Sequence, residues 1–581
     1  MKTKKLQLAL MFIFSATIMV SIFSSTMFGD VADNKLIIDG SIRQNGDLTL
    51  NIDGNAQLQA AANGGGSGTE GDPWIIENLD IDANFSTYCI WIRNTDEYFE
   101  IRNCNLTEGL RGIYLDNVMN GYIHDNNITN SEDYAIYTDG LFDTVIEEND
   151  VTGVINFDGM YLRDTFNSSV VQNQISNVTE DAINLYTSEE NNVTGNGIFN
   201  TTRGIYLSFS HNNNISLNVL NDTNDYGIRF QYSTNSFIGG NTIVNGSKQS
   251  DQYGIHIYTN SENLTIVGNE IVDQDYAIAL ESGTGDVLNI NITENLLHDN
   301  NRGIRSVDEN ENITISYNEI YNNNNGGIDL YANYSMIFNN SIHDNNNVNM
   351  VGLRIQQGGS NYTIVNNTIY QNDEGIRIWN LEDCILKNNY VHHNDNDGII
   401  ASGSITNTSI MNNRMESNGD FGLYVNGDGY HIEDNDIEQN HDGLYLNGDG
   451  NLVSDNYINN NYEYGFFMPT SSNNNLTNNV ISAHNLAPTG IGFYISGSSG
   501  NVLRNNTISS NDIGMQIITC SNIELNNNTI SSNDIGLQIE TCSNIELNNN
   551  TISSNDIGLQ IETCSNIELN NNTISSNDIG L

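Results

Sequence analysis

The stretch NNNTISSNDIGLQIETCSNIEL at residues 526–547 recurs without change at residues 548–569. A close copy precedes it from Arg504, and a partial copy ends the sequence at Leu581. Within each copy, short runs of alternating apolar and polar residues are separated by Asn, Asp, Gly and Ser. Alternation with a period of two indicates strands with one buried face. Because three such runs and three polar corners fit into 22 residues, the stretch predicts one turn of a coiled parallel sheet.

The same frame continues backward through the chain in less regular copies. A small residue followed by I-x-φ, where φ is apolar, recurs every 21 to 27 residues from Cys89 to Gly580. One Asn recurs in step with it from Asn126 to Asn572. We interpret this column as an amide ladder whose members take the left-handed backbone conformation at tight corners. With no helix signal, the chain is predicted to be all-β, a single-stranded parallel β-helix of about 20 coils of 22–24 residues.

The opening coils resemble a known family. The segment GSGTEGDPWIIENL at 66–79, followed by TYCIWIRNTDEYFEIRNC at 87–104, is similar to the first coils of right-handed parallel β-helix proteins. These are proteins of the NosD-like, carbohydrate-binding and sugar-hydrolase type. The resemblance extends from about residue 36 to the end and implies a right-handed solenoid. It implies no single activity, since the repeat occurs in enzymes, adhesins and metal-delivery proteins.

Three regions are expected along the chain. Residues 1–35 read as a signal peptide or N-terminal anchor, because Lys2, Lys4 and Lys5 precede an apolar run. Residues 36–83 are expected to form an N-terminal cap and the entry to the first coil, and residues 84–581 the β-helix. The sequence stops inside an expected strand, so we expect it to be truncated at its C-terminus. The predicted location is secreted or at the cell surface, extracellular or periplasmic, with no other membrane span.

Charge limits the partners. The chain has 72 acidic against 19 basic residues and a net charge of −53, which argues against nucleic acid or an anionic membrane as a partner. The same acid density leaves Ca²⁺ as a possible cofactor, although neither the calcium nonapeptide nor an EF-hand is present. No other cofactor or metal site is predicted, and the oligomeric state stays open.

The cysteines predict little chemistry. Three of the six recur at one position of successive copies, so Cys520, Cys542 and Cys564 are expected to stack as a row of small residues. Cys89 and Cys104 could cross-link the first coil after export. Stacked thiols also leave soft-metal binding or oxidation as alternatives.

Residue x of each I-x-φ unit is expected to face solvent, and its column is rich in aromatic and basic side chains. Rings repeated at coil spacing could form a platform for sugars, or could simply stabilise neighbouring strands. A guanidinium could pair with a glycan carboxylate, or with acids of its own coils. The candidate glycan-binding residues are Trp91, Tyr114, Tyr137, Tyr161, Tyr206, Arg305, Arg354, Arg377, Tyr424 and Tyr445.

A second outward column contains the candidates for catalysis, although no catalytic residue is assigned. It consists of His298, Tyr321, His343, Tyr370 and His392. A His or Tyr could remove a proton from a uronic acid whose carboxylate an Arg neutralises. However, the sequence lacks the G-H-G of polygalacturonase-like enzymes and the D-P-H-E of mannuronan epimerases.

The predicted function is a non-catalytic rod at the cell surface that binds an extracellular polysaccharide or surface glycan, mediates adhesion or serves as a structural spacer. One alternative is a polysaccharide lyase or epimerase that acts on uronic-acid glycans. The second alternative is copper handling, which the NosD likeness implies.

Overall fold

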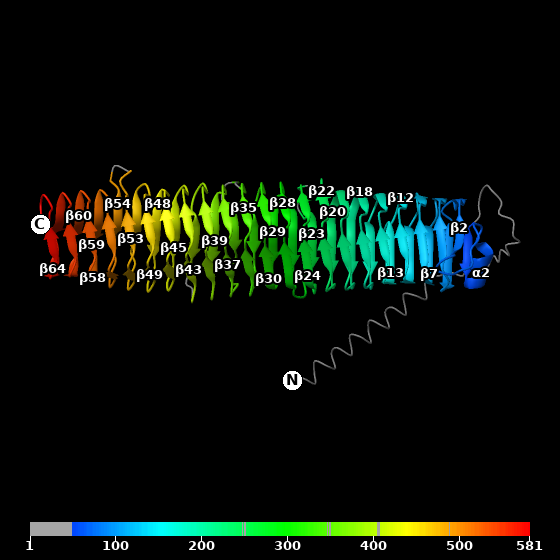
Figure 1. The fold of residues 1–581 in the computed structure, drawn as a ribbon, viewed down its shortest axis with the longest axis horizontal. Helices are drawn as coiled ribbons and strands as arrows, with labels where there is room; N and C mark the ends of the chain where they lie inside the picture. The colour runs from blue at the N-terminus through cyan, green and yellow to red at the C-terminus, as the bar shows by residue number, and fades with distance from the viewer. Residues whose placement is uncertain are drawn as a thin grey trace, which may run out of the picture. The chain divides into compact units, whose positions relative to one another are not determined.

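The computed structural model describes residues 49–581, except for residues 247, 249, 250, 309, 346, 348, 349, 404–406, 487 and 488. The expected signal segment, residues 1–35, lies outside the described residues. The described chain is a right-handed parallel solenoid of about 21 coils (Figure 1). The predicted fold class is therefore confirmed. No described helix has the length and apolar character needed to cross a membrane.

Each regular coil contributes three short strands, and each strand pairs in parallel with its counterpart one coil further on. The first two coils consist of β1 (Leu50–Asp53), β2 (Trp74–Glu77) and β3 (Asp80–Asp82), then β4 (Ile90–Thr95), β5 (Phe99–Arg102) and β6 (Asn105–Thr107). The longest strands, β18 (Gly197–Ser208) and β20 (Val219–Gln231), run through a corner without interruption. Because β1 already pairs with β4, the paired strands of the described chain begin at Leu50.

One short helix departs from the predicted all-β chain. Helix α2 (Asn55–Ala61) lies between β1 and β2, and its Leu58 is fully buried. The expectation of no helix is wrong at this position. The segment NAQLQAA contains only one strongly apolar residue, too few to show a helical period. Burying Leu58 at the first coil withdraws apolar core surface from water there.

The core is a continuous column of aliphatic side chains along the described coils. In β7 (Arg111–Met119), for example, Ile113, Leu115 and Val118 are fully buried, whereas Tyr114 and Asp116 between them are half-buried. Alternation along each strand produces this division, as the sequence predicts. Each fully buried aliphatic side chain contributes about 1.5–3 kcal/mol of transfer free energy, so the stacked coils supply most of the stability.

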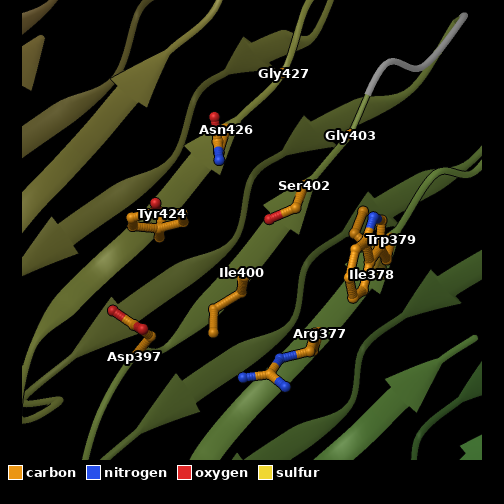
Figure 2. A pocket seen from close by; sticks show the side chains of 10 residues that line it. All are labelled: Arg377, Ile378, Trp379, Asp397, Ile400, Ser402, Gly403, Tyr424, Asn426 and Gly427. Carbon is orange, nitrogen blue, oxygen red and sulfur yellow. The ribbon is translucent and has the colours of Figure 1, made fainter. Parts of the chain in front are cut away.

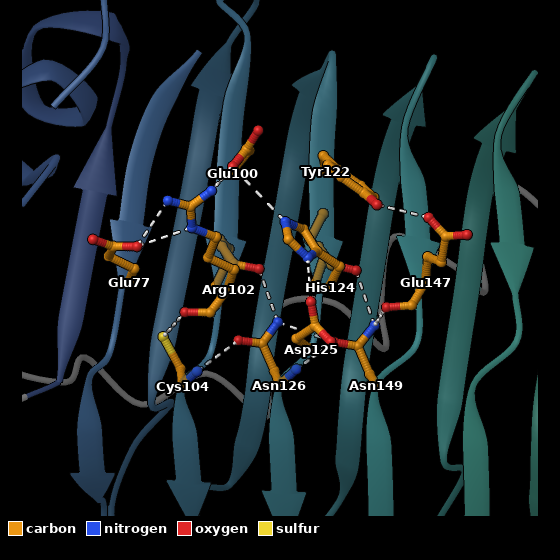
Figure 3. A network of polar contacts seen from close by, with 12 residues as sticks. Glu77, Glu100, Arg102, Cys104, Tyr122, His124, Asp125, Asn126, Glu147 and Asn149 are labelled. Atoms are coloured by element: carbon orange, nitrogen blue, oxygen red, sulfur yellow. Dashed lines mark hydrogen bonds and ion pairs between the residues drawn. The ribbon is translucent and has the colours of Figure 1, made fainter. Parts of the chain in front are cut away.

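The predicted amide ladder is confirmed, but its backbone explanation is wrong. Asn126 donates from Nδ2 to the carbonyl oxygen of Ile101 at 2.9 Å and to Oδ1 of Asn149 at 2.9 Å (Figure 3). The ladder asparagines from Asn126 to Asn550 are buried. The left-handed conformation belongs instead to the residue before each of them, such as Asp125 with φ 53° and Glu148 with φ 53°. Each Asn is thus selected for its hydrogen bonds, and its predecessor for the turn.

A second amide ladder lies at another corner and was not foreseen. It consists of Asn300, Asn323, Asn345, Asn372, Asn394, Asn418, Asn440 and Asn461, and then of Asn511, Asn533, Asn555 and Asn577. Between the two runs His484 takes the ladder position: its Nδ1 accepts the backbone N–H of Asn461 at 3.1 Å. The ladder therefore tolerates one imidazole in place of an amide.

The corner backbone leads to a stability prediction at Leu217. This residue has φ 56° and is 63% exposed, directly before ladder residue Asn218. The left-handed region costs an ordinary L-residue about 1 kcal/mol or more, whereas Asn tolerates it. Replacing Leu217 with Asn is expected to raise the free energy of unfolding by roughly 0.5–1 kcal/mol, measured by urea denaturation. Leu452→Asn, at an exposed strand position, is the control; an equal gain there would contradict the backbone explanation.

Candidate functional site

A groove of about 680 Å³ crosses one face of the solenoid over β39 (Glu374–Trp379), β42 (Ile399–Ser402) and β45 (Phe421–Asn426). The groove forms because side chains at paired positions of the three strands differ in size. Arg377, Ile400 and Tyr424 form one row of paired positions, and Trp379, Ser402 and Asn426 form the next. In each row the middle residue is the short one, so β42 forms a floor between two taller walls (Figure 2).

Two aromatic rings border this groove with a free face. Trp379 is 54% exposed and makes no ring contact with any described residue. Tyr424 stacks on Tyr445 with ring centroids 4.3 Å apart and planes 6° apart. Because Tyr445 lies one coil further on, the opposite face of Tyr424 is turned toward Ile400 and the groove. The groove thus has aromatic surface on both walls.

The charged groups of the groove are unevenly paired. Arg377 forms an ion pair with Glu374 of its own coil. Asp397 accepts the backbone N–H of Phe421 at 3.0 Å. Burial, together with the nearby Asp420 carboxylate, raises the pKa of Asp397 to about 7. Asp397 thus forms no ion pair with a described residue, although the charge of Arg377 acts to lower its pKa.

Of the three predicted arginines, only Arg377 lines the groove. Arg354 donates from Nε to Oδ1 of Asp329 at 2.9 Å, and this contact raises the pKa of Arg354. Arg305 donates to the hydroxyl oxygen of Tyr276 at 2.6 Å. Each guanidinium already has a partner within the protein, which is the structural alternative to a bound polyanion.

The aromatic column has the predicted register, since its members pair coil by coil from Trp91 onward. Their rings, however, pack against one another along the rod, edge-to-face between Tyr114 and Tyr137 and stacked in the pairs on either side. The rings of Trp91 and Tyr114 are 5.4 Å apart with planes 8° apart, and those of Tyr137 and Tyr161 are 5.3 Å apart with planes 19° apart. The guanidinium of Arg111 lies 3.7 Å from the Tyr137 ring centroid. Most ring faces in this part of the column are therefore covered by neighbouring side chains.

Not every member of the column faces solvent as predicted. Neighbouring outward columns close over the shorter side chains and over those bonded to adjacent coils. The buried members are Asn184, His256, Ala279, Asp329 and Ile400. Outward orientation on a sheet therefore does not guarantee exposure.

The second predicted column forms one continuous stack of rings. Its successive centroids, from His298 through Tyr321, His343 and Tyr370 to His392, are 4.6–5.2 Å apart, with planes within 11° of parallel. The Nδ1 atoms of His298 and His343 lie 2.7 and 2.8 Å from carboxylate oxygens of the next residue. These rings belong to strands other than those of the predicted arginines, and no hydrogen bond or ion pair between described residues joins the two sets.

Sequence reasoning did not single out a buried polar cluster at β16 (Asp181–Tyr186). The amide of Asn184 lies 3.2 Å from carboxylate oxygens of both Asp158 and Asp181, and Tyr226 donates its hydroxyl hydrogen to Asp181 at 2.6 Å. Burial raises the pKa of both carboxyl groups. Both acids directly precede the small residue of their coil, which is the only sequence signal for this cluster. The described contacts satisfy the two acids internally.

Candidate metal ligands and free cysteines are both present among the described residues. Among them, one group of three candidate ligands brings its ligand atoms within 4.8 Å of one another: Asp420, His441 and Asp442. An imidazole in the set does not suit Ca²⁺, which prefers oxygen ligands.

Cys89 and Cys104 are free and buried. The predicted cysteine stack is present, with the Cys520 backbone N–H 3.2 Å from Sγ of Cys542.

Several solved structures show a distant likeness. The Dettilon tailspike protein (gp208) is 16% identical to this chain, with a TM-score of 0.30. The match covers 59% of this chain and 60% of the tailspike chain. A tailspike mutant of E. coli bacteriophage HK620 in complex with pentasaccharide is 11% identical, with 65% and 71% covered and a TM-score of 0.38. The A-module of Azotobacter vinelandii mannuronan C-5 epimerase AlgE4 is 13% identical, with 64% and 88% covered and a TM-score of 0.19. These scores are too low to support a conclusion about function.

Comparison with curated proteins finds no match. Two family models do match. The model of the periplasmic copper-binding protein NosD matches residues 154–325. The model described as the right-handed beta helix region matches residues 61–218, 302–441, 351–492 and 442–581, which is most of the chain. Together with the stacked parallel coils, this match shows that the chain belongs to the right-handed β-helix family.

Proposed function

We propose that this β-helix is an exported, non-catalytic protein that binds a polysaccharide, and that the groove over β39, β42 and β45 is its central binding site. The observation that supports this proposal is the pair of free aromatic faces, on Trp379 and Tyr424, that border one cavity. Sugar rings present C–H groups that pack on aromatic faces, while their hydroxyl groups need polar partners. Arg377, Asp397 and Asn426 supply such partners along the same groove.

The remaining predicted aromatic residues take a different role in this proposal. Stacked rings on adjacent coils stabilise the pairing of neighbouring strands. In this proposal the solenoid is stiffened by ring contacts among Trp91, Tyr114, Tyr137 and Tyr161. Tyr206 contributes through its hydrogen bond to Gln231 of the next coil, and Tyr445 stacks on Tyr424. Copper handling, which the description of the NosD model names, is the second alternative. Among the described residues of 154–325, no three His, Cys, Asp or Glu ligand atoms lie within 4.8 Å of one another.

The proposal predicts that Trp379→Ala and Tyr424→Ala each weaken binding to a polysaccharide ligand about tenfold, because each removes one aromatic wall. A glycan array with the intact protein identifies a ligand, and isothermal titration then gives the affinities of the variants. Tyr457→Ala is the control, because Tyr457 is 44% exposed outside the groove. Equal binding by all variants, or equal loss in the control, would rule out the groove as the site.

A further inference from the structure

In and beside the groove, acidic groups outnumber basic ones. Its single lining cation, Arg377, is already paired with Glu374. Oε2 of Glu374 is buried without a hydrogen-bond partner among the described residues. Burial and the carboxylates of Asp420 and Glu374, on the coils to either side, raise the pKa of Asp397, while the charge of Arg377 lowers it. The whole chain adds a net charge of −53 to this local excess.

We propose that the groove selects a glycan whose sugars carry a protonated amine, and disfavours one whose sugars carry carboxylates. This inference rests on the proposed function, because it names the class of glycan that the groove takes. It replaces the polyanion suggested by the arginine column with a ligand of opposite charge.

An ammonium group matches the unpaired chemistry of the groove. The carboxylate of Asp397 accepts one hydrogen bond from a described residue, the backbone N–H of Phe421, so it retains lone pairs for a charged donor. The open face of Trp379 attracts cations as well as sugar C–H groups. A glycan that places an amine near Asp397 therefore gains an ion pair there, while its sugar rings can contact the aromatic walls along the same groove.

A sugar carboxylate meets the opposite situation. To pair with it, Arg377 must give up Glu374. That exchange would leave Glu374, which is only 7% exposed, without its cation. A buried carboxylate that loses its ion-pair partner is costly. The ligand would also face Asp397 across the groove, where like charges repel.

The test compares three oligosaccharides by isothermal titration at neutral pH: a glucosamine oligomer, the same oligomer N-acetylated, and a uronic-acid oligomer. The free-amine oligomer is expected to bind about tenfold tighter than the acetylated one, as a charge-assisted hydrogen bond provides. Asp397→Asn is expected to abolish the tenfold preference of the protein for the free-amine oligomer over the acetylated one. Asp222→Asn removes an equal charge at an exposed corner where Asn is tolerated, and should keep the preference.

Several outcomes would overturn the inference. One is tighter binding of the uronic-acid oligomer. Another is equal affinity for all three oligomers with loss in Trp379→Ala, which would leave the proposed function intact. Unchanged binding of the amine by Trp379→Ala would show adsorption to the acidic surface, and loss of the preference with a chelator would assign the acids to a metal ion. Absence of binding to any glycan would instead refute the proposed function itself.

Discussion

Replacing Asn218 with Leu is expected to destabilise the β-helix by roughly 3–6 kcal/mol, because the change leaves buried polar groups without partners. Asn218 donates from Nδ2 to the carbonyl oxygen of Val193 at 2.9 Å and to Oδ1 of Asn241 at 3.0 Å. Its own Oδ1 accepts the backbone N–H and the side-chain amide of Asn196 at 3.0 and 2.9 Å. A leucine fills the volume but offers neither donors nor acceptors, so the Asn196 N–H and the Val193 carbonyl lose their partners.

The neighbouring position provides a matched comparison. Leu217→Asn introduces the same amide one residue earlier, where the side chain is exposed and only the backbone conformation matters. Urea denaturation should therefore show opposite signs for the two substitutions, and hydrogen exchange should locate the loss in the coils around Asn218. An Asn218→Leu protein within about 1 kcal/mol of the wild type would mean that the ladder bonds contribute no net stability.

The coil frame was predictable from sequence because it depends on periodicity alone. Parity placed Trp91, Tyr114 and Tyr137 in one register column, and the structure pairs them in that register. Repetition likewise identified the Asn126 ladder. The second ladder escaped notice because its column contains His484 and begins only at Asn300.

The groove was not predictable in the same way, because it depends on differences in side-chain size between neighbouring coils. Ile400 reads in the sequence as an isolated apolar residue in an outward column, and only its position between Arg377 and Tyr424 makes it a floor. Trp379 lies two residues after Arg377 in the same strand, so the alternation of a β-strand does predict that the two side chains share a face. The partners of the arginines depend on rotamers, which the sequence does not specify.

His484→Asn is expected to make the protein less sensitive to acid, by about 2 kcal/mol between pH 7 and pH 5. The imidazole of His484 is fully buried. Its Nδ1 accepts the Asn461 N–H at 3.1 Å, and its Nε2 lies 3.3 Å from the carbonyl oxygen of Ile458. Burial lowers the pKa of His484 from 6.5 to about 4. The folded state therefore binds fewer protons than the unfolded state, and stability falls as the pH drops from about 6.5 toward 4.

The wild-type protein alone cannot isolate the contribution of His484, because buried carboxyl groups change the pH dependence of the free energy of unfolding in the opposite direction. Burial raises the pKa of Asp158 to about 6 and that of Asp397 to about 7, so the folded state gains stability from their protonation over the same pH range. The wild-type profile is the sum of both effects. Subtracting it from the profile of His484→Asn cancels the contribution of the carboxyl groups, which are common to both proteins, and leaves that of the imidazole.

Asn also occupies this ladder position in the neighbouring coils, so the variant should fold. Urea denaturation at several pH values measures the difference, with His431→Asn on a half-buried strand position as the control. A flat difference would show that His484 is protonated in the folded state as readily as in the unfolded chain.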